Sequence, residues 1–349
     1  MNHRRENEMK DIAQISVMLL AGSFGAHTTL HAAVSTSPLR LEKVISIDNV
    51  KGEFDHLAID LAAKRLYIAA EDQQTVEVLD VGVGKHLDSI RLFARPHGLV
   101  FLPQTSQLFV ADGNDASGKF VDLDGPKVVT AVKTALRADS VAFDPATQTI
   151  FVANGGRVAK MNHSLVTAIN ALRREKTGET SIDSQVLEAL AVESSSKRLY
   201  VNLMDQGAVA VVDRTAMNLM ETWVLDGAAE NSAMALDEAA HRLYVACRRP
   251  PALVVLDTRP GKTVAHLPCV DHADDAYFDS EKKRIYVSGG EGAISVYRTG
   301  EKQLPSKITD VRTAPGAKTS LFVPQWNELF VAVPAGTDGH ARLLIFRVE

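Results

Sequence analysis

Hydrophobic positions within Phe54–Asp80 fall into three short runs that polar residues separate. The runs His56–Asp60, Arg65–Ala69 and Thr75–Asp80 are rich in β-branched and aromatic residues, which favour strands. The polar residues between them are typical of hairpin turns. The pattern predicts a meander of three antiparallel strands.

The same three-run pattern returns six more times along the chain. The ends of the first runs are Asp60, Leu102, Asp144, Glu193, Asp237, Asp279 and Val323, spaced by 42, 42, 49, 44, 42 and 44 residues. A period in the forties with several strands per unit is typical of propeller blades rather than of helical solenoids. The sequence therefore predicts an all-β fold, a seven-bladed β-propeller of four-stranded antiparallel blades. Within the longest unit, Met161–Gln185 is an insertion that either a helical turn or an outer strand would fit.

The two ends of the repeat region predict how the ring closes. A strand pattern at Leu39–Val50 precedes the first repeat, while the last repeat ends with a third strand at Ala341–Val348 and has no fourth. A closed ring leaves no free sheet edge. We therefore expect Leu41–Ile47 to supply the outer strand of the seventh blade. Residues 36–349 should form one domain, because each blade buries its faces only against its neighbours.

Residues 1–35 do not fit the repeat and have the outline of a secretory signal peptide. They combine a charged start, an apolar segment centred on Val17–Leu20 and small residues at Ala33–Ser35. A disordered leader is the alternative. The signal interpretation predicts a periplasmic or secreted bacterial protein. No other run approaches the length of a membrane-spanning helix, so we expect no span in the mature chain.

Composition narrows the classes of partner. The chain has 349 residues, of which 46% are hydrophobic and 23% charged, and its formal net charge is -5. No global basic field therefore attracts nucleic acid or an anionic membrane. The two cysteines, Cys247 and Cys269, fall on the second and fourth strands of the fifth repeat. They should be unpaired, because two strand spacings separate them by about 9.6 Å and a disulfide needs less than about 7 Å.

The second runs share a motif: RLYIA, QLFVA, TIFVA, RLYVN, RLYVA, RIYVS and ELFVA. With the Val-x-Val-Leu-Asp pattern that follows, they resemble the repeats of the YVTN or YncE-like β-propeller family over roughly residues 41–348. The resemblance implies a seven-bladed extracytoplasmic monomer and assigns no activity. It also raises single-stranded DNA binding, which would need a basic, aromatic-lined groove. The ring of candidate residues is acidic and only 6% of the chain is aromatic, which argues against nucleic acid.

Because the chain carries no local catalytic motif, any site must be assembled from several blades. In a propeller the start of each first strand and the end of each second strand share one face. The first-strand positions five residues before the aligned ends are Asp55, His97, Asp139, Glu188, Ser232, Asp274 and Lys318. His56 and Asp275 occupy the next position inward. The polar second-strand ends are Glu71–Asp72, Asp112–Asp115, Asn154–Gly156, Asn202, Arg248–Arg249 and Glu291.

Asp139 and Glu188, from adjacent blades, are the candidate ligands for a hard metal such as Ca²⁺ or Mg²⁺. Asp55, His56 and His97 form a second cluster that is suited to acid–base transfer. A water-filled channel would tolerate the same charges without any ligand.

Further around the ring, Lys318 lies between Asp274 and Asp55 and would neutralise both, or would form an ion pair with Asp274 alone. Arg248 and Arg249 form a basic rim feature that would clamp a carboxylate or a phosphate, or would lie in a solvated loop.

Two hypotheses of function follow. The first is an exported propeller that binds a partner protein or a small polar ligand at the channel mouth, with no assigned reaction. The second is a lactone hydrolase or lyase that depends on a divalent metal at the same mouth. The enzyme hypothesis depends on the acidic ring and on analogy with other propellers of the same fold.

Overall fold

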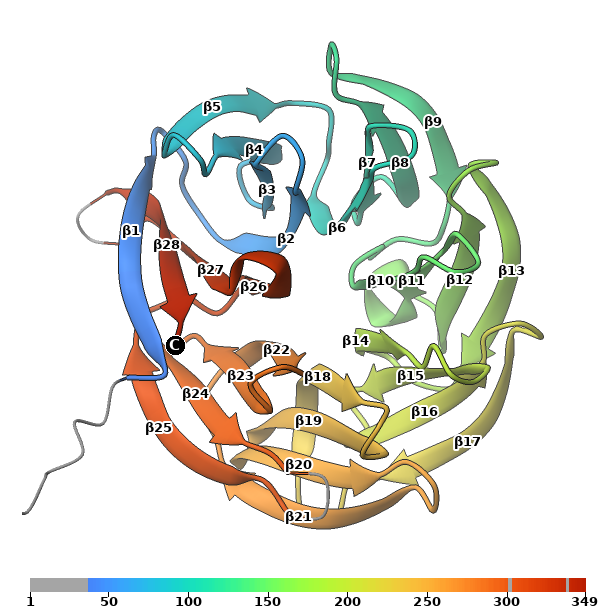
Figure 1. Ribbon diagram of the computed structural model, residues 1–349. Coiled ribbons are helices and arrows are strands. Elements are labelled where there is room, and N and C mark those ends of the chain that lie inside the picture. Colours follow the sequence, from blue (N-terminus) through green and yellow to red (C-terminus); the bar gives the residue numbers. More distant parts are fainter. Residues whose placement is uncertain (1–36, 301–302, 337–338) are drawn as a thin grey trace, which may run out of the picture. The chain divides into compact units, whose positions relative to one another are not determined.

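The computed structural model describes residues 37–300, 303–336 and 339–349. Seven four-stranded antiparallel sheets are arranged in a ring (Figure 1). The predicted seven-bladed β-propeller is therefore confirmed. The predicted leader, residues 1–35, lies outside the described residues, and the domain boundary beside it stays a prediction.

The two inner strands of each blade pair antiparallel. The innermost strands are β2 (Phe54–Asp60), β6 (Pro96–Leu102), β10 (Val141–Asp144), β14 (Leu187–Val192), β18 (Ala229–Asp237), β22 (Ala273–Asp279) and β26 (Ser320–Val323). The second strands are β3 (Arg65–Ala70), β7 (Gln107–Asp112), β11 (Thr149–Gly155), β15 (Arg198–Leu203), β19 (Arg242–Arg249), β23 (Arg284–Gly289) and β27 (Glu328–Val333).

The two outer strands complete each blade. The third strands are β4 (Thr75–Asp80), β8 (Ser117–Asp122), β12 (Ser164–Asn170), β16 (Ala208–Asp213), β20 (Pro251–Asp257), β24 (Ala293–Arg298) and β28 (Ala341–Val348). The outermost strands are β5 (Lys85–Ile90), β9 (Lys127–Lys133), β13 (Glu175–Ile182), β17 (Asn218–Val224), β21 (Lys262–Pro268), β25 (Ser306–Arg312) and β1 (Leu39–Ile47). Cys247 is buried in β19, Cys269 follows β21 directly, and both are free thiols.

Burial explains why the second strands carry the clearest repeat motif. In β3, every residue after Arg65 is buried, because both faces of the strand lie against a neighbouring blade. Such strands read as continuous apolar runs. The outermost strand β21 alternates exposed and half-buried residues, since it covers the blade only from one side. The core is correspondingly divided into seven apolar clusters, one at each interface between blades.

The ring closes as the sequence predicts. β1 pairs antiparallel with β28, from Leu39 opposite Val348 to Ile47 opposite Ala341. Figure 1 shows the N-terminal strand as the outer edge of the blade that holds the C-terminus. This pairing joins the two ends of the described chain and removes the free edge of β28.

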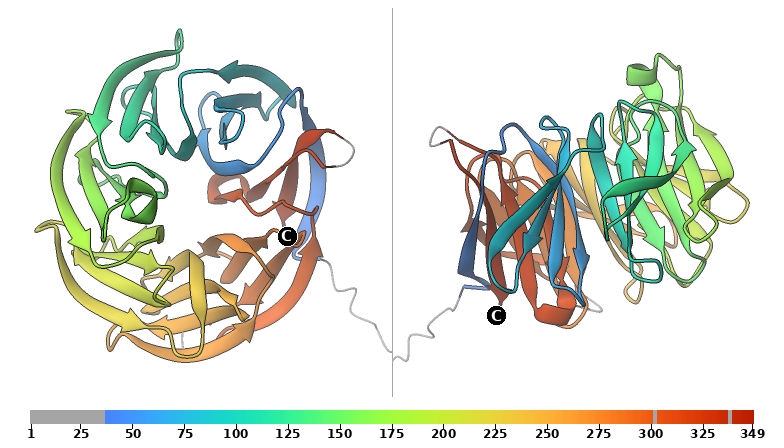
Figure 2. Two further views of the ribbon diagram at one scale, coloured as in Figure 1. Left: turned by 180° about the vertical axis from the view of Figure 1, so that it is seen from behind. Right: turned by 90° about the horizontal axis from the view of Figure 1, so that it is seen from above.

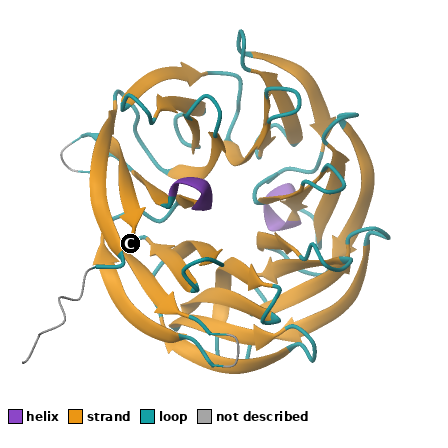
Figure 3. Ribbon diagram, viewed as in Figure 1, coloured by secondary structure: helices purple, strands orange, loops and turns teal. Residues whose placement is uncertain are grey.

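The insertion in the third blade forms strands. Strands β12 and β13 pass through Met161–Gln185, so the strand alternative is correct. Extra chain before them forms a short 3₁₀ turn, η1 (Gly156–Ala159), which projects beyond the blades in the edge-on view of Figure 2. With η2 (Pro324–Trp326) it makes up the helical structure of the described residues (Figure 3). Within that part of the chain, no helix is long and apolar enough to cross a membrane.

Candidate functional site at the channel mouth

The seven ring positions meet at one cavity of about 340 Å³. Its lining includes every one of them: Asp55, His97, Asp139, Glu188, Ser232, Asp274 and Lys318. They lie at or just before the start of each innermost strand, so each blade contributes one side chain. Counting positions in the repeat therefore predicts which residues line the cavity.

The local backbone explains how these side chains are aimed inward. In β2, β6, β14, β18 and β22 the pairing with the second strand shifts register at the ring position. Such β-bulges bend a strand and redirect a side chain. In β6 the bulge needs glycine, because a Cβ on Gly98 would lie 2.5 Å from the carbonyl oxygen of Asp139. The same contact carries a hydrogen bond from the Gly98 amide to that oxygen.

Alternating charges link the first two blades to the sixth. The Nδ1–H of His97 donates to Asp55 at 2.5 Å. The other oxygen of Asp55 lies 3.5 Å from Nε2 of His56, and Nδ1 of His56 lies 3.3 Å from Asp275. Asp275 does not line the mouth cavity: it lines a second, inner cavity of about 200 Å³. Its Oδ2 accepts the backbone amide of Ser320 at 2.8 Å.

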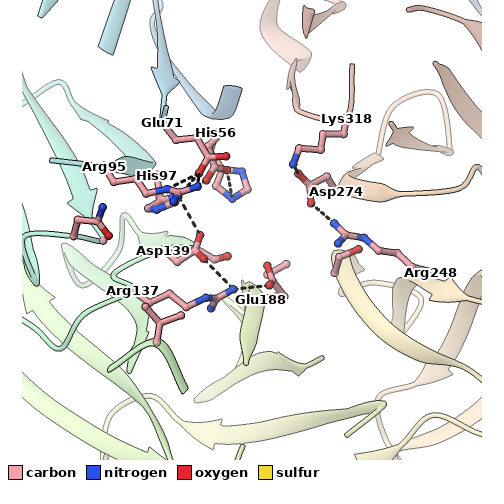
Figure 4. A pocket seen from close by; sticks show the side chains of 17 residues that line it. His56, Glu71, Arg95, His97, Arg137, Asp139, Glu188, Arg248, Asp274 and Lys318 are labelled. Atoms are coloured by element: carbon pink, nitrogen blue, oxygen red, sulfur yellow. Dashed lines mark hydrogen bonds and ion pairs between the residues drawn. The ribbon is translucent and has the colours of Figure 1, made fainter. Parts of the chain in front are cut away.

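The alternation continues through the third and fourth blades. Nη2 of Arg137 lies 2.7 Å from Glu188 and 3.1 Å from Asp139, and its Nη1 donates to the carbonyl of Leu187 (Figure 4). Asp139 in turn lies 3.9 Å from Nδ1 of His97. The predicted metal pair thus meets around a guanidinium, whose charge takes the position that a cation would occupy between the two carboxylates.

A separate cluster occupies the fifth to seventh blades. Arg248 donates from Nη2 to Asp274 at 2.6 Å and from Nε to the carbonyl of Ala273 at 2.9 Å. Lys318 lies 3.8 Å from Asp274. Arg249 does not line the cavity: its side chain is 75% exposed and pairs with Glu230. Of the predicted basic pair, only Arg248 faces the mouth.

Neighbouring charges determine which groups are ionised. Burial lowers the pKa of His97, but Asp139 and Asp55 outweigh it and raise the pKa to about 9. Burial also lowers the pKa of His56, yet Asp55 and Asp275 raise it well above 6.5. Both histidines are therefore cations at neutral pH. For Asp55, burial opposes ionisation, but the two histidines hold its pKa below the ordinary value.

Two carboxyl groups are shifted in the opposite direction. Burial, reinforced by Asp139 and only partly offset by Arg137, raises the pKa of Glu188 to about 7. Burial raises the pKa of Asp274 to about 6 against the effect of Lys318 and Arg248. The protonation state of Glu188 therefore changes near neutral pH.

Several polar second-strand ends hold the loops between blades instead of lining the cavity. Asp112 is fully buried and accepts the backbone amides of Ala94 and Arg95 at 2.9 and 2.8 Å. Lys119 neutralises it at 2.8 Å. Asn154 accepts the amide of Ala135 in the corresponding loop of the next blade. These side chains position the loop residues that precede the ring.

Val158 and two charged residues of the cavity were missed in the sequence. Arg95 and Arg137 come two positions before His97 and Asp139, and both line the mouth. Side chains two positions apart in an extended chain point to the same side. Applying that period to the ring would have found both arginines. Arg95 binds Glu71 with two nitrogens, at 3.0 and 2.9 Å.

One group of side chains has the make-up of a metal site. Among the described residues, Asp55, Glu71 and His97 bring one ligand atom each within 4.8 Å of one another. Two carboxylates and an imidazole are ligands that divalent metals accept. All three are already engaged, however, since Asp55 binds His97 and Glu71 binds Arg95.

Comparisons with known proteins support the fold alone. No protein-family model and no curated protein matches the sequence. The structure is similar to a chain of hydrazine synthase from Kuenenia stuttgartiensis, with 15% identity, 86% of this chain and 98% of that chain covered, and a TM-score of 0.73. It is also similar to a chain of the mitotic checkpoint complex, with 14% identity, coverage of 96% and 99%, and a TM-score of 0.73. The chain is a β-propeller, and propellers often bind partner proteins.

Proposed function

We propose that this chain is an exported binding propeller that takes a small polar ligand, or the polar loop of a partner protein, in the cavity at its channel mouth. The convergence of one side chain from each of seven blades on a cavity of about 340 Å³ is the observation that carries the proposal. Concave sites of roughly 300 Å³ and more are typical of small-molecule binding. Export depends on the interpretation of residues 1–35 and, with the YVTN-like repeat motif, remains part of the proposal.

A thermal-shift screen of the full chain against small polar compounds tests this function. A ligand at a hundredfold excess over its Kd stabilises the folded state by about 2.7 kcal/mol. The variant Ala189→Phe fills the cavity, which Ala189 lines. Ala63→Phe is the matched control, because Ala63 is exposed in the β2–β3 turn on the opposite face. Compounds should stabilise the wild type and Ala63→Phe but not Ala189→Phe, and the absence of any such compound argues against the proposal.

The second candidate is the metal-dependent lactone hydrolase or lyase. The group Asp55, Glu71 and His97 favours this enzyme hypothesis. We propose this group as the metal position instead of the Asp139–Glu188 pair, because Arg137 lies between those two carboxylates. Elemental analysis of the purified protein, followed by thermal melts with Ca²⁺, Mg²⁺ or Zn²⁺, tests it. Metal-free protein whose melting is unchanged by all three ions, in the wild type and in Glu71→Gln alike, would dispose of the enzyme.

A further inference from the structure

Lys318 brings an ammonium group to the mouth that its neighbours leave without hydrogen bonds. Its Nζ lies 3.6 Å from Glu53 and 3.8 Å from Asp274, both beyond hydrogen-bond distance. Within the described part of the chain, this Nζ makes no hydrogen bond, although the backbone amide of Lys318 donates to Gly316. An ammonium group has three donors. Because Lys318 lines the cavity with its side chain only 29% exposed, those donors face the space that a ligand would fill.

The guanidinium of Arg248 also has an unused hydrogen-bond donor. Its Nε and Nη2 donate to Ala273 and Asp274, whereas Nη1 makes no hydrogen bond within the residues the structure describes. Arg248 and Lys318 share Asp274, whose side chain is 15% exposed, whereas Glu53, the other carboxylate near Lys318, is about half exposed. Because solvent screens the exposed Glu53, only Asp274 neutralises the two cations closely in this cluster. An anionic group from outside would complete it.

The opposite wall of the cavity offers acceptors. Figure 4 shows Asp139 and Glu188 across the cavity from Arg248 and Lys318. Arg137 holds both carboxylates in place. Carboxylate oxygens accept hydrogen bonds from hydroxyl and ammonium groups. The same carboxylates repel an anion of double charge, so a singly charged carboxylate fits this cavity better than a phosphate dianion.

We propose that the ligand of the mouth is a small monocarboxylate bearing hydroxyl or amino groups. Lys318 Nζ and Arg248 Nη1 bind its carboxylate, and its hydrogen-bond donors face Asp139 and Glu188. This inference rests on the proposed binding function and specifies the chemical class of the ligand.

Calorimetric titration of the full chain tests the ligand class. D-gluconate and glycine serve as carboxylates, D-glucitol as the neutral counterpart of gluconate, and inorganic phosphate as the competing anion. At least one carboxylate should bind about tenfold more tightly than glucitol and phosphate, and Lys318→Met should weaken it about tenfold, since it removes a charge-assisted contact. Lys318→Arg should restore binding. Lys85→Met, an exposed lysine on the opposite face, should leave binding unchanged.

The outcomes separate this inference from the broader function. Failure of both gluconate and glycine to bind more tightly than glucitol and phosphate overturns the monocarboxylate. So does carboxylate binding that Lys318→Met leaves intact while the variant has a wild-type circular dichroism spectrum. If screened compounds still bind the wild type and fail with Ala189→Phe, the mouth remains a binding site for another class of ligand. Failure of both experiments removes the proposed function as well.

Discussion

The two sides of the channel mouth differ in how their charges are paired. From the fourth blade to the first, each charged side chain of the cavity contacts at least one opposite charge, and Arg137 lies between Asp139 and Glu188. From the fifth blade to the seventh, Arg248 and Lys318 share Asp274. We call these the paired side and the open side. Figure 4 shows them facing each other across the cavity.

The difference separates structural charges from charges available to a ligand. A buried charge that loses water is stabilised only by close partners. On the paired side those partners are already present in the protein, so an added ion gains little there. On the open side, Lys318 has lost part of its hydration without gaining a hydrogen bond. A ligand gains most where a partner is missing.

The largest expected effect lies behind the paired side, at Asp112. Asp112→Ala releases the amides of Ala94 and Arg95 and leaves Lys119 only the exposed carboxylate of Asp115 in place of the buried one. Breaking a buried ion pair from one side costs about 3–5 kcal/mol. Chemical denaturation should show a loss of this size. Asp124→Ala, in an exposed turn, serves as the control, and a comparable loss there would contradict the explanation.

Arg137 and Lys318 compare the two sides directly. Arg137→Met leaves Asp139 and Glu188 facing each other, and we expect a loss of about 2 kcal/mol at pH 8, since protonation of Glu188 relieves part of the repulsion. Lys318→Met should change stability by less than about 1 kcal/mol, because Asp274 keeps Arg248. Denaturation of both variants measures the contrast. Equal losses would mean that the open side contributes as much to the free energy of unfolding as the paired side does.

Glu188 predicts a pH dependence. Its pKa rises from 4.5 in the unfolded chain to about 7 in the folded protein, so the folded state binds more protons between these values. The contribution of Glu188 to stability is therefore present below pH 4.5 and is lost as pH rises to about 7. Relative to Glu188→Gln, the wild type should lose on the order of 2 kcal/mol over this window. Parallel stability–pH curves for the two proteins would exclude the shift.

The smallest effect is expected at Arg249. Its side chain is exposed and, among the residues that the structure describes, pairs with Glu230 alone, so Arg249→Ala should change stability by less than about 0.5 kcal/mol. Carboxylate binding should also be unchanged, whereas Arg248→Ala should weaken it. Calorimetry on the two adjacent variants distinguishes them. A loss of binding in Arg249→Ala would mean that the carboxylate binds at the exposed rim and not at Arg248 inside the cavity.

The fold could be predicted because its determinants repeat. Each second strand has an apolar centre like Leu66–Ala70, because the middle of the strand is buried on both faces. The missing fourth strand after β28 likewise predicted the pairing with β1. The insertion in the third blade does not repeat, so the sequence could not distinguish a helical turn from a strand there. Periodicity has no information about a segment that occurs once.

Within the site, position was predictable and pairing was not. Counting from Asp60 and its equivalents placed Asp139 and Glu188 at the mouth. Nothing in that count placed Arg137 between them, because the contact joins the loop before β10 to strand β14 of the next blade. Asp112 was likewise predicted to lie on the face of the mouth as a polar second-strand end, whereas the fold uses it to hold a loop.

By itself, the sequence determined the number of blades, their strand order and the residue that each blade sends to the mouth, because these follow from local periodicity. Only the tertiary structure decided which charges neutralise one another and which are left for a ligand. Electrostatic pairing depends on distances of a few ångströms between residues far apart in the chain, such as the 3.8 Å from Lys318 to Asp274.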